Sequence, residues 1–510
     1  MVDIGEQTDF NPSTTNTLYD DFAASWQMNM DFAEMYLNIL QGGSYLDVFG
    51  GKATEAASQY TWRKNNSIAL DFAADLINLR VDNIFRTAPV RSYEDSPYAT
   101  FIEEFLQDVD GGGSDINKFM KKALRSYYVN GIDIVVDKRS SDIQPENLAQ
   151  ERELGIRPYL GMFSPLERVD WSVDHGNNYL WVRYDLGMSP STDELLSDEQ
   201  YQQYITFNKN EWRLYSQVEN SDKTSSTYVT SGNIGINEVP VVPMYFETSS
   251  RSDFPLMPIS LLTRISPIAR YILNLTSQAQ LDLYISVAFM AITGIDADDA
   301  PGEITPGIVW TLPEGSTVEE MGKNVAPVVE KREWINLLIG EILRLGKLTG
   351  GTGDLEARAA SGVQVSLERT DLENEMRSTS EQLEATEEEV MRLAVSRMVG
   401  RSITKEELQY NVEYNTKFIT QSVNAIIEQA KAFFEIGAGQ IAEASPDLAK
   451  IVVTKILDAL AKDDDLNYME AWEQIQKATF VKPKELVAET DGSTDKDDIE
   501  GAVEDTVNNV

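Results

Sequence analysis

The glycine-rich segment at residues 346–353, GKLTGGTG, is the first candidate for chemistry. Glycine-rich loops that bind nucleotide phosphates follow a strand and place their lysine after the last glycine, in the pattern Gly-x4-Gly-Lys-Ser/Thr. Here Lys347 precedes the paired glycines, and helical patterns flank the segment on both sides. The sequence therefore favours a hinge or protruding loop over a nucleotide site. The residues of this loop are Gly346, Lys347, Leu348, Thr349, Gly350, Gly351, Thr352 and Gly353.

Histidine and cysteine chemistry is narrowly limited in this sequence. There is no cysteine, which excludes disulfides, thiolate zinc sites and cysteine nucleophiles. The one histidine, His175, would have to serve any Ser-His-Asp triad. It stands in the run WSVDHG, which is typical of a strand end that enters a turn. We therefore interpret His175 as a polar loop residue.

Acidic pairs such as Glu319-Glu320, Asp298-Asp299 and residues 463–465 could supply the two carboxylates of a glycosidase. With 83 acidic residues such pairs arise by chance. Residues 463–465 also resemble the start of a calcium loop, but the glycine and terminal glutamate of an EF-hand are missing. The sequence predicts no catalytic residue, no cofactor and no metal site.

The charge balance is strongly acidic, with 43 basic against 83 acidic residues and a formal net charge of −40. A surface of this sign repels nucleic acid at long range, so tight DNA binding through counterion release is not expected. Such a surface still suits a wall past which DNA slides without being held.

The elements around these residues begin with alternating helices. Apolar residues at helical spacing predict helices over 18–39, 67–85 and 115–129. Asn130-Gly131 is a helix stop signal, and a short apolar strand is expected at 132–137.

A β-rich segment is expected between residues 158 and 246. It includes a strand at 179–184, and a hairpin in which 204–207 and 211–215 flank a three-residue loop. The segment 239–246 contains two prolines, which indicates an edge strand.

Longer helices follow. Ser266-Pro267 predicts a helix start, and that helix is expected to run to about residue 292. A second helix is expected at 331–345, and the longest at 361–399. The apolar stripe of the longest helix is narrow, so we expect it to be exposed or to pack against neighbouring subunits.

The carboxy-terminal third predicts further helices, and an acidic tail from about residue 483 has the composition of a disordered segment. No secretory signal and no membrane-spanning apolar stretch is visible, so we expect a soluble protein of the cytoplasm. The fold class expected is α+β and mainly helical.

Several local patterns, taken in order, resemble the portal proteins of tailed bacteriophages. Residues 127–137 (YYVNGIDIVVD), 239–243 (VPVVP), 277–294 and 360–367 (ASGVQVSL) match, respectively, a helix before a short strand, a proline-marked strand, a first stem helix, and the start of a long helix after a loop. The order of elements carries the resemblance, and it covers roughly residues 20–480.

The resemblance implies a portal arrangement of wing, stem, clip and crown. Its expected boundaries are an amino-terminal arm and wing at 1–256, a stem helix at 257–290, a clip at 291–330, a second stem helix at 331–346, a tunnel loop at 347–360, a long wing helix at 361–400, a crown at 401–482 and the acidic tail at 483–510.

The resemblance also implies partners. They are further copies of the chain in a ring, expected to be a dodecamer at one capsid vertex, together with the major capsid protein and scaffold, the terminase large subunit, a head-to-tail adaptor, and double-stranded DNA that passes without tight binding. The expected location is the virion, and the host cytoplasm during assembly. Arg344 and Lys347 are basic residues beside a channel that is expected to be acidic. They are candidates for weak phosphate contact or, as we favour, for pairing with carboxylates of the next subunit.

Two other classes stay open. One is a different virion assembly, scaffold or tail protein that never meets DNA. The other is an acidic cytoplasmic hydrolase that uses paired carboxylates.

Overall fold

The structure is a computed structural model, and it describes residues 6–40, 44–48, 55–138, 156–189, 201–219, 225–286, 290–293, 317–320, 326–348, 362–416 and 418. The chain divides between Phe418 and Ile419, and the description below concerns the part before that boundary. Its sheets are antiparallel, and helices pack against them, so the fold class is α+β.

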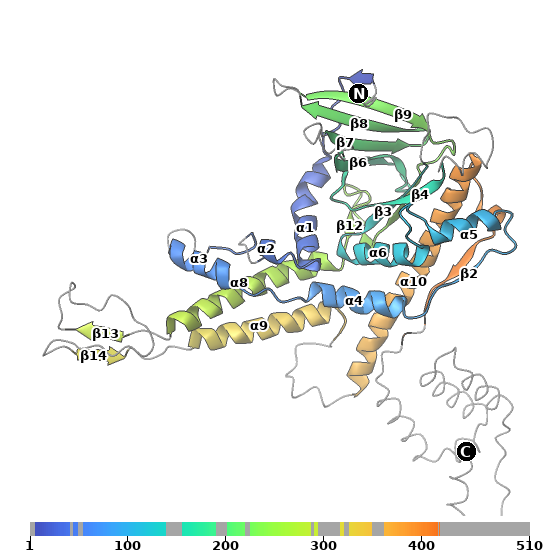
Figure 1. Ribbon diagram of the computed structural model, residues 1–510. Helices are drawn as coiled ribbons and strands as arrows, with labels where there is room; N and C mark the ends of the chain where they lie inside the picture. Colours follow the sequence, from blue (N-terminus) through green and yellow to red (C-terminus); the bar gives the residue numbers. More distant parts are fainter. Residues whose placement is uncertain are drawn as a thin grey trace, which may run out of the picture. The chain divides into compact units, whose positions relative to one another are not determined.

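A six-stranded antiparallel sheet dominates the β-rich segment (Figure 1). Its strand order is β1-β9-β8-β7-β6-β5, so each strand from β5 to β9 pairs with the next along the chain. The strands are β1 (Glu6–Thr8), β5 (Arg168–Val173), β6 (Tyr179–Met188), β7 (Gln202–Asn208), β8 (Glu211–Glu219) and β9 (Ser225–Asn233). The predicted hairpin is confirmed as β7–β8, although its loop is one residue shorter because Asn208 belongs to β7.

A three-stranded sheet of order β10-β3-β4 lies beside it, formed by β3 (Ile132–Lys138), β4 (Pro158–Phe163) and β10 (Val241–Met244). The predicted strand at 132–137 is confirmed. The edge position predicted from the prolines is also confirmed, since β10 pairs with β3 only. Three two-stranded pairs complete the sheets: β11 (Glu247–Thr248) with β12 (Pro258–Ile259), β13 (Met290–Thr293) with β14 (Thr317–Glu320), and β15 (Asn411–Glu413) with β2 (Val90–Ser92).

The shorter helices are α1 (Thr17–Ala33), α2 (Leu37–Leu40), α3 (Ala57–Asn66), α4 (Ala73–Ile84), α5 (Ala99–Gln107) and α6 (Ile116–Val129). Helix α6 packs against β3, and α3 packs against α8. Local signals account well for α6. The Asp115 side chain caps it by accepting a hydrogen bond from the Lys118 amide, and the apolar face of α6 is buried. After the helix, Gly131 adopts φ +84°, and a Cβ there would lie 2.5 Å from the Tyr245 ring. A glycine is therefore required at this turn into β3.

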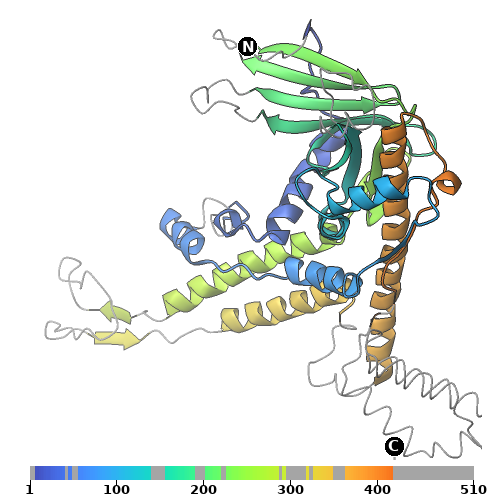
Figure 2. The same ribbon diagram turned by 45° about the vertical axis from the view of Figure 1, so that its right-hand side comes forward.

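Three long helices and a short one follow: α8 (Leu262–Ser286), α9 (Ala326–Leu345), α10 (Gly362–Val399) and α11 (Lys405–Leu408). Helices α8 and α9 run side by side, and the β13–β14 pair lies beyond one end of them (Figures 1 and 2). Helix α10 packs against β3, β4 and β10. No helix among the described residues is both long and apolar enough to cross a membrane.

The narrow apolar stripe of the longest helix is not left uncovered, contrary to the prediction. Met376, Leu383, Val390 and Leu393 are all at most 2% exposed within this one chain. The pattern of apolar residues does not reveal this burial, because α10 also buries charged residues, which form ion pairs in the core. Arg397, for example, lies 3.0 Å from the Asp137 carboxylate of β3.

Several predicted helix boundaries were wrong. The helix expected over 18–39 breaks after Ala33, where Met35 has a positive φ, and the one expected at 67–85 begins only at Ala73. The helix start predicted at Ser266-Pro267 lies within α8. The true cap is Ser260, whose hydroxyl accepts from the Thr263 amide at 3.1 Å.

The segment around Met290 was also expected to be helical, but it is strand β13. Helix α9 begins before residue 331, at Ala326. The helix predicted at 361–399 is confirmed as α10, which has 38 residues.

Candidate functional site

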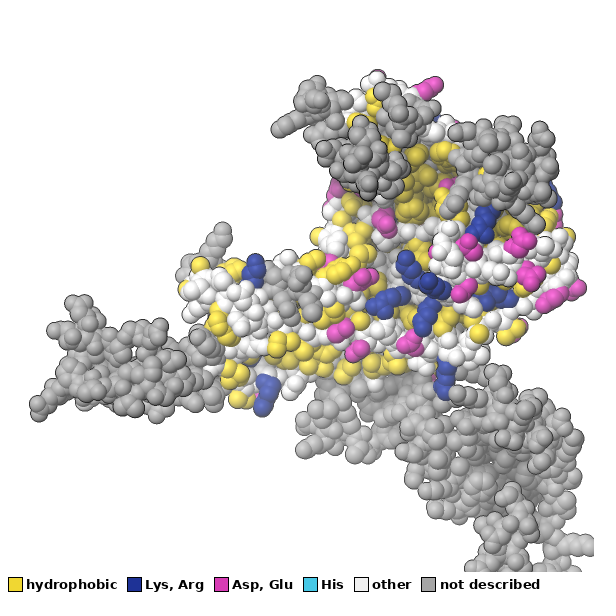
Figure 3. Space-filling view, viewed as in Figure 1, with side chains coloured by type: hydrophobic (Ala, Val, Ile, Leu, Met, Phe, Trp, Pro, Cys, Tyr) yellow, Lys and Arg dark blue, Asp and Glu magenta, His cyan; other side chains and the backbone are white. Residues whose placement is uncertain are grey.

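The pair of helices α8 and α9 exposes large apolar side chains along its length. Trp334 is 58% exposed, Tyr271 54% and Leu337 50%. Leu283 and Val329 add to this surface, which we call the exposed helix-pair face and which lies on both helices. Figure 3 shows hydrophobic side chains gathered along this region. A folded chain rarely presents so many large apolar groups on two adjacent helices unless a partner covers them.

The two helices are joined by apolar side chains packed between them and by an ion pair. Ile335, Leu338 and Ile339 of α9 pack inward, and Ile342 is fully buried. The Lys331 amine lies 2.5 Å from the Asp282 carboxylate on α8. The exposed apolar residues are therefore not needed to join α8 to α9.

The end of α9 is a closed helix terminus, not the start of a free loop. The amide of Leu348 donates to the Leu343 carbonyl at 2.9 Å, and the amide of Lys347 donates to the Arg344 carbonyl at 3.0 Å. This is the Schellman pattern, with Lys347 in the left-handed position at φ +55°. A Cβ on Gly346 would lie 2.6 Å from Leu76 of α4, so this glycine serves close packing.

Arg80 of α4 ties this terminus to α10. Its side chain is fully buried and donates to the Gly346 carbonyl at 2.8 Å and to the Glu375 carboxylate at 2.8 Å. The other carboxylate oxygen of Glu375 lies 2.9 Å from the Lys347 amine. One carboxylate on α10 thus holds two cations, and this cluster fixes the end of α9 against α4 and α10. We call it the α9 anchor; it consists of Arg80, Gly346, Lys347 and Glu375.

The two basic residues predicted to face a channel are paired within their own chain. Lys347 bonds to Glu375, as above. Arg344 bonds to Glu341 one turn earlier on α9, and this hydrogen bond lowers the pKa of the Glu341 carboxyl. The expected pairing was with carboxylates of the next subunit, whereas the carboxylates paired with both residues here belong to the same chain. Of the predicted loop, Gly346, Lys347 and Leu348 are in place; Thr349, Gly350, Gly351, Thr352 and Gly353 lie outside the described residues.

The other residues singled out from the sequence do not converge on a reactive centre. His175 is exposed in the turn between β5 and β6, as predicted. Glu319 and Glu320 lie in β14, while residues 298–299 and 463–465 are outside the described part. Within the described part, no group of three or more His, Cys, Asp or Glu side chains is arranged to hold a metal ion.

Two buried carboxylates organise polar networks that the sequence did not reveal. Asp133 of β3 accepts hydrogen bonds from Tyr179, Tyr184 and Tyr245 at 3.0, 2.8 and 2.5 Å. The fully buried Arg168 donates to the hydroxyls of Tyr179 and Tyr245 and so completes the network. Burial and the Asp133 charge raise the pKa of Tyr184 well above its usual value.

The second network centres on Glu387 of α10. Its carboxylate is fully buried and accepts from Arg91 at 2.6 Å and from Tyr410 and Tyr414 at 2.5 Å each. Burial and the Glu387 charge raise the pKa of Tyr414 well above its usual value. In both networks the carboxylate, hydroxyl and guanidinium groups are largely enclosed by protein, and their hydrogen bonds hold strands and helices together.

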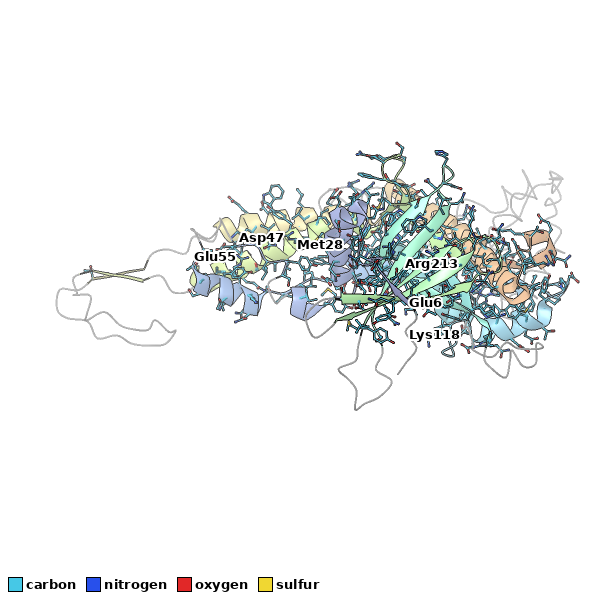
Figure 4. All side chains as sticks on the ribbon, turned by 90° about the horizontal axis from the view of Figure 1, so that it is seen from above. Glu6, Met28, Asp47, Glu55, Lys118 and Arg213 are labelled. Atoms are coloured by element: carbon cyan, nitrogen blue, oxygen red, sulfur yellow. The ribbon has the colours of Figure 1, made fainter. Side chains whose placement is uncertain are left out.

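A cavity of about 290 Å³ lies beside α8, lined by Met28, Asp47, Pro267, Arg270, Tyr271 and Asn274. Met28 and Asp47 are labelled in Figure 4. Asp47 and Arg270 form an ion pair at 2.7 Å. The Asn274 side chain donates to the Tyr45 carbonyl and accepts from the Asp47 amide. The polar lining of the cavity is thus mostly satisfied by the chain itself.

The exposed helix-pair face is therefore the candidate functional site. Comparison of the sequence with protein-family models gave no match, and comparison with curated proteins gave no significant relative.

Proposed function

We propose that this chain is the subunit of a ring that forms the portal of a tailed bacteriophage. The exposed helix-pair face carries the proposal. Tyr271, Leu283, Val329, Trp334 and Leu337 leave a large apolar area in water, and further copies of the chain could cover it.

The order of elements supports the same proposal. A mixed α/β body leads into α8, paired strands β13 and β14 stand between α8 and α9, and the long α10 follows. This order agrees with the wing, stem, clip and long helix that the sequence resemblance implies. The α9 anchor would then lie at the base of the stem and hold the first residues of the tunnel loop.

The charge of the chain fits a conduit for DNA. A net charge of −40 on each subunit would line a ring with negative potential, which repels phosphate and lets the duplex move without being gripped. Arg344 and Lys347 would not oppose this movement, since each already bonds to a carboxylate. Terminase, capsid protein and adaptor would be the partners of such a ring, and no cofactor is needed for this role.

Imaging of the purified full-length chain tests the proposal. We expect negative-stain images to show rings with a central hole, and light scattering to give a mass that is a multiple of 57.1 kDa. A stable 57.1 kDa monomer across concentrations would contradict the proposal. A defined assembly without a hole would instead favour the second candidate, a virion scaffold or tail protein, which the same exposed apolar face supports.

A further inference from the structure

Helix α6 presents a basic face in a chain whose overall charge is strongly negative. Lys118, Lys121, Lys122 and Arg125 stand at positions i, i+3, i+4 and i+7, so they lie on one side of the helix. The opposite side is buried through Phe119 and Met120, among others. Figure 3 shows basic side chains gathered over α6, and Lys118 is labelled in Figure 4. These four residues are called the α6 basic face.

The chain only partly neutralises this face. Lys121 lies 2.9 Å from the Asp82 carboxylate on α4, but both side chains are largely exposed. Arg125 donates to a neutral group, the Asn78 amide oxygen. Lys118 and Lys122 are exposed and have no carboxylate partner among the described residues.

A surface of the opposite sign lies on α10 and β15, formed by Glu381, Glu384, Glu388 and Glu413, and is called the α10 acidic face. Partial burial of Glu384, followed by the charges of Glu381, Glu413 and Glu388, raises the pKa of the Glu384 carboxyl. Two cations lie close by. Lys405 bonds to Glu388 at 3.1 Å, and Arg377 precedes Glu381 by one turn without forming an ion pair in the described part of the chain.

The α10 acidic face points away from α6, whereas the α6 basic face lies toward α4, where Lys121 pairs with Asp82. The side of α10 toward α6 is marked by Thr379 and Gln382, which bond to Tyr128 and Tyr127. Glu381 and Glu384 each stand two residues further along, which turns them about 160° away from Thr379 and Gln382 on a helix of 3.6 residues per turn. A contact between the two faces therefore cannot form within one chain.

We propose that the α6 basic face of one subunit docks on the α10 acidic face of the next copy. The occupant is a second copy because every chain carries both halves, which have opposite charge and face in different directions. Such a head-to-tail contact repeats around a closed ring. This inference rests on the proposed function, for which it supplies a specific subunit contact that depends on salt.

Charge reversal tests the contact in the full-length chain. We expect Lys118→Glu with Lys122→Glu to weaken self-association on the order of tenfold at about 0.1 M salt, where charges still act over about 10 Å. Glu381→Lys with Glu413→Lys should weaken it similarly, since both carboxylates are exposed. Asp21→Asn, at an exposed position on α1, serves as the control and should leave association unchanged.

Recombining the reversed halves distinguishes a contact from a loss of folding. An equimolar mixture of the two double variants should form rings again, because each Glu-bearing α6 then meets a Lys-bearing α10. Association of both double variants at the wild-type level, or a mixture that stays dissociated, would overturn the proposed contact. If truncation after residue 482 weakens association as much as Lys118→Glu with Lys122→Glu does, the partner of the α6 basic face is the acidic tail and not the α10 acidic face. If Lys118→Glu with Lys122→Glu abolishes binding to a short DNA duplex but leaves self-association intact, the partner of the α6 basic face is nucleic acid. If the unaltered chain forms no assembly at all, the proposed function itself fails.

Discussion

At the scale of single residues, the two buried carboxylates, Asp133 and Glu387, each hold several partners from different parts of the chain. Among the described residues, Asp133 supplies the one negative charge of the network that encloses Arg168, and three tyrosine hydroxyls donate to it. Neither Asp133 nor Glu387 was singled out from the sequence, since each stands in a run that reads as an ordinary strand or helix. Their partners are brought together only by the tertiary fold.

Asp133→Asn should therefore destabilise the chain by about 3 kcal/mol, because it leaves the Arg168 cation buried without a countercharge. Urea unfolding measures the change. Asp21→Asn, which removes an exposed carboxylate from α1, should stay within about 0.5 kcal/mol of the unaltered chain. A loss no larger than that of the control would show that the network is not needed for stability.

In contrast to Asp133, the ionised Glu384 carboxylate lowers the stability of the folded chain. Its pKa is raised in the folded chain by partial burial and by neighbouring carboxylates, so its ionised form opposes folding. Stability therefore falls as the pH rises through the unfolded pKa of a glutamate and then through the raised folded value. Below both values the carboxyl is neutral in both states and has no such effect.

Glu384→Gln should consequently raise the melting temperature at pH 7, while the amide oxygen can still accept from the Tyr414 backbone. The gain should disappear below about pH 4. Glu333→Gln on the exposed side of α9 should show no comparable difference between the two pH values. Thermal unfolding monitored by circular dichroism decides the question, and an equal gain at both pH values would speak against the electrostatic cause.

At the scale of elements, the α9 terminus shows how a glycine can be mistaken for flexibility. Gly346 was expected to open a mobile loop, yet it touches Leu76, and its carbonyl accepts from Arg80. Lys347 and Glu375 are far apart in the sequence and meet only in the tertiary fold, so their spacing alone could not predict this ion pair.

Two glycines, one inside α9 and one directly after it, give a matched test of this terminus. Gly346→Ala should cost about 1–3 kcal/mol, because the new methyl group meets Leu76 at 2.6 Å. Gly340→Ala has open space around its Cβ and should stabilise α9 by up to about 1 kcal/mol. Chemical unfolding of both variants measures the difference; a Gly346 variant as stable as the Gly340 variant would mean that the terminus yields easily.

The elements that the sequence predicted well are those with local signals. Helix α6 has its cap at Asp115 and a regular apolar face, and β3 follows a glycine that the turn requires. Helix α3 was missed because its sequence is polar, and its buried face depends on Arg63, which bonds to Glu55 and to Ser277 of α8. The burial of α10 was missed for the same reason: paired charges in the core do not resemble an apolar stripe.

At the scale of the whole molecule, the exposed helix-pair face should matter for assembly and not for folding. Trp334→Glu with Leu337→Glu should prevent ring formation while leaving the melting temperature of the monomer nearly unchanged, since both side chains are at least half exposed. Asn336→Glu places one such charge on an exposed position of α9 that is not apolar, and should allow rings to form. Size-exclusion chromatography with light scattering reports both outcomes. Rings formed equally by all three proteins would show that the surface is not an interface.

The amino-terminal strand has a consequence for handling the protein. Residues Glu6–Thr8 form β1, which pairs with β9 at the margin of the six-stranded sheet. Removal of these residues would leave the backbone amides and carbonyls of β9 open, and unpaired strand margins recruit strands from other molecules. A chain trimmed past Thr8 should therefore precipitate or form irregular aggregates during storage. Affinity tags are better placed where they do not disturb this short strand.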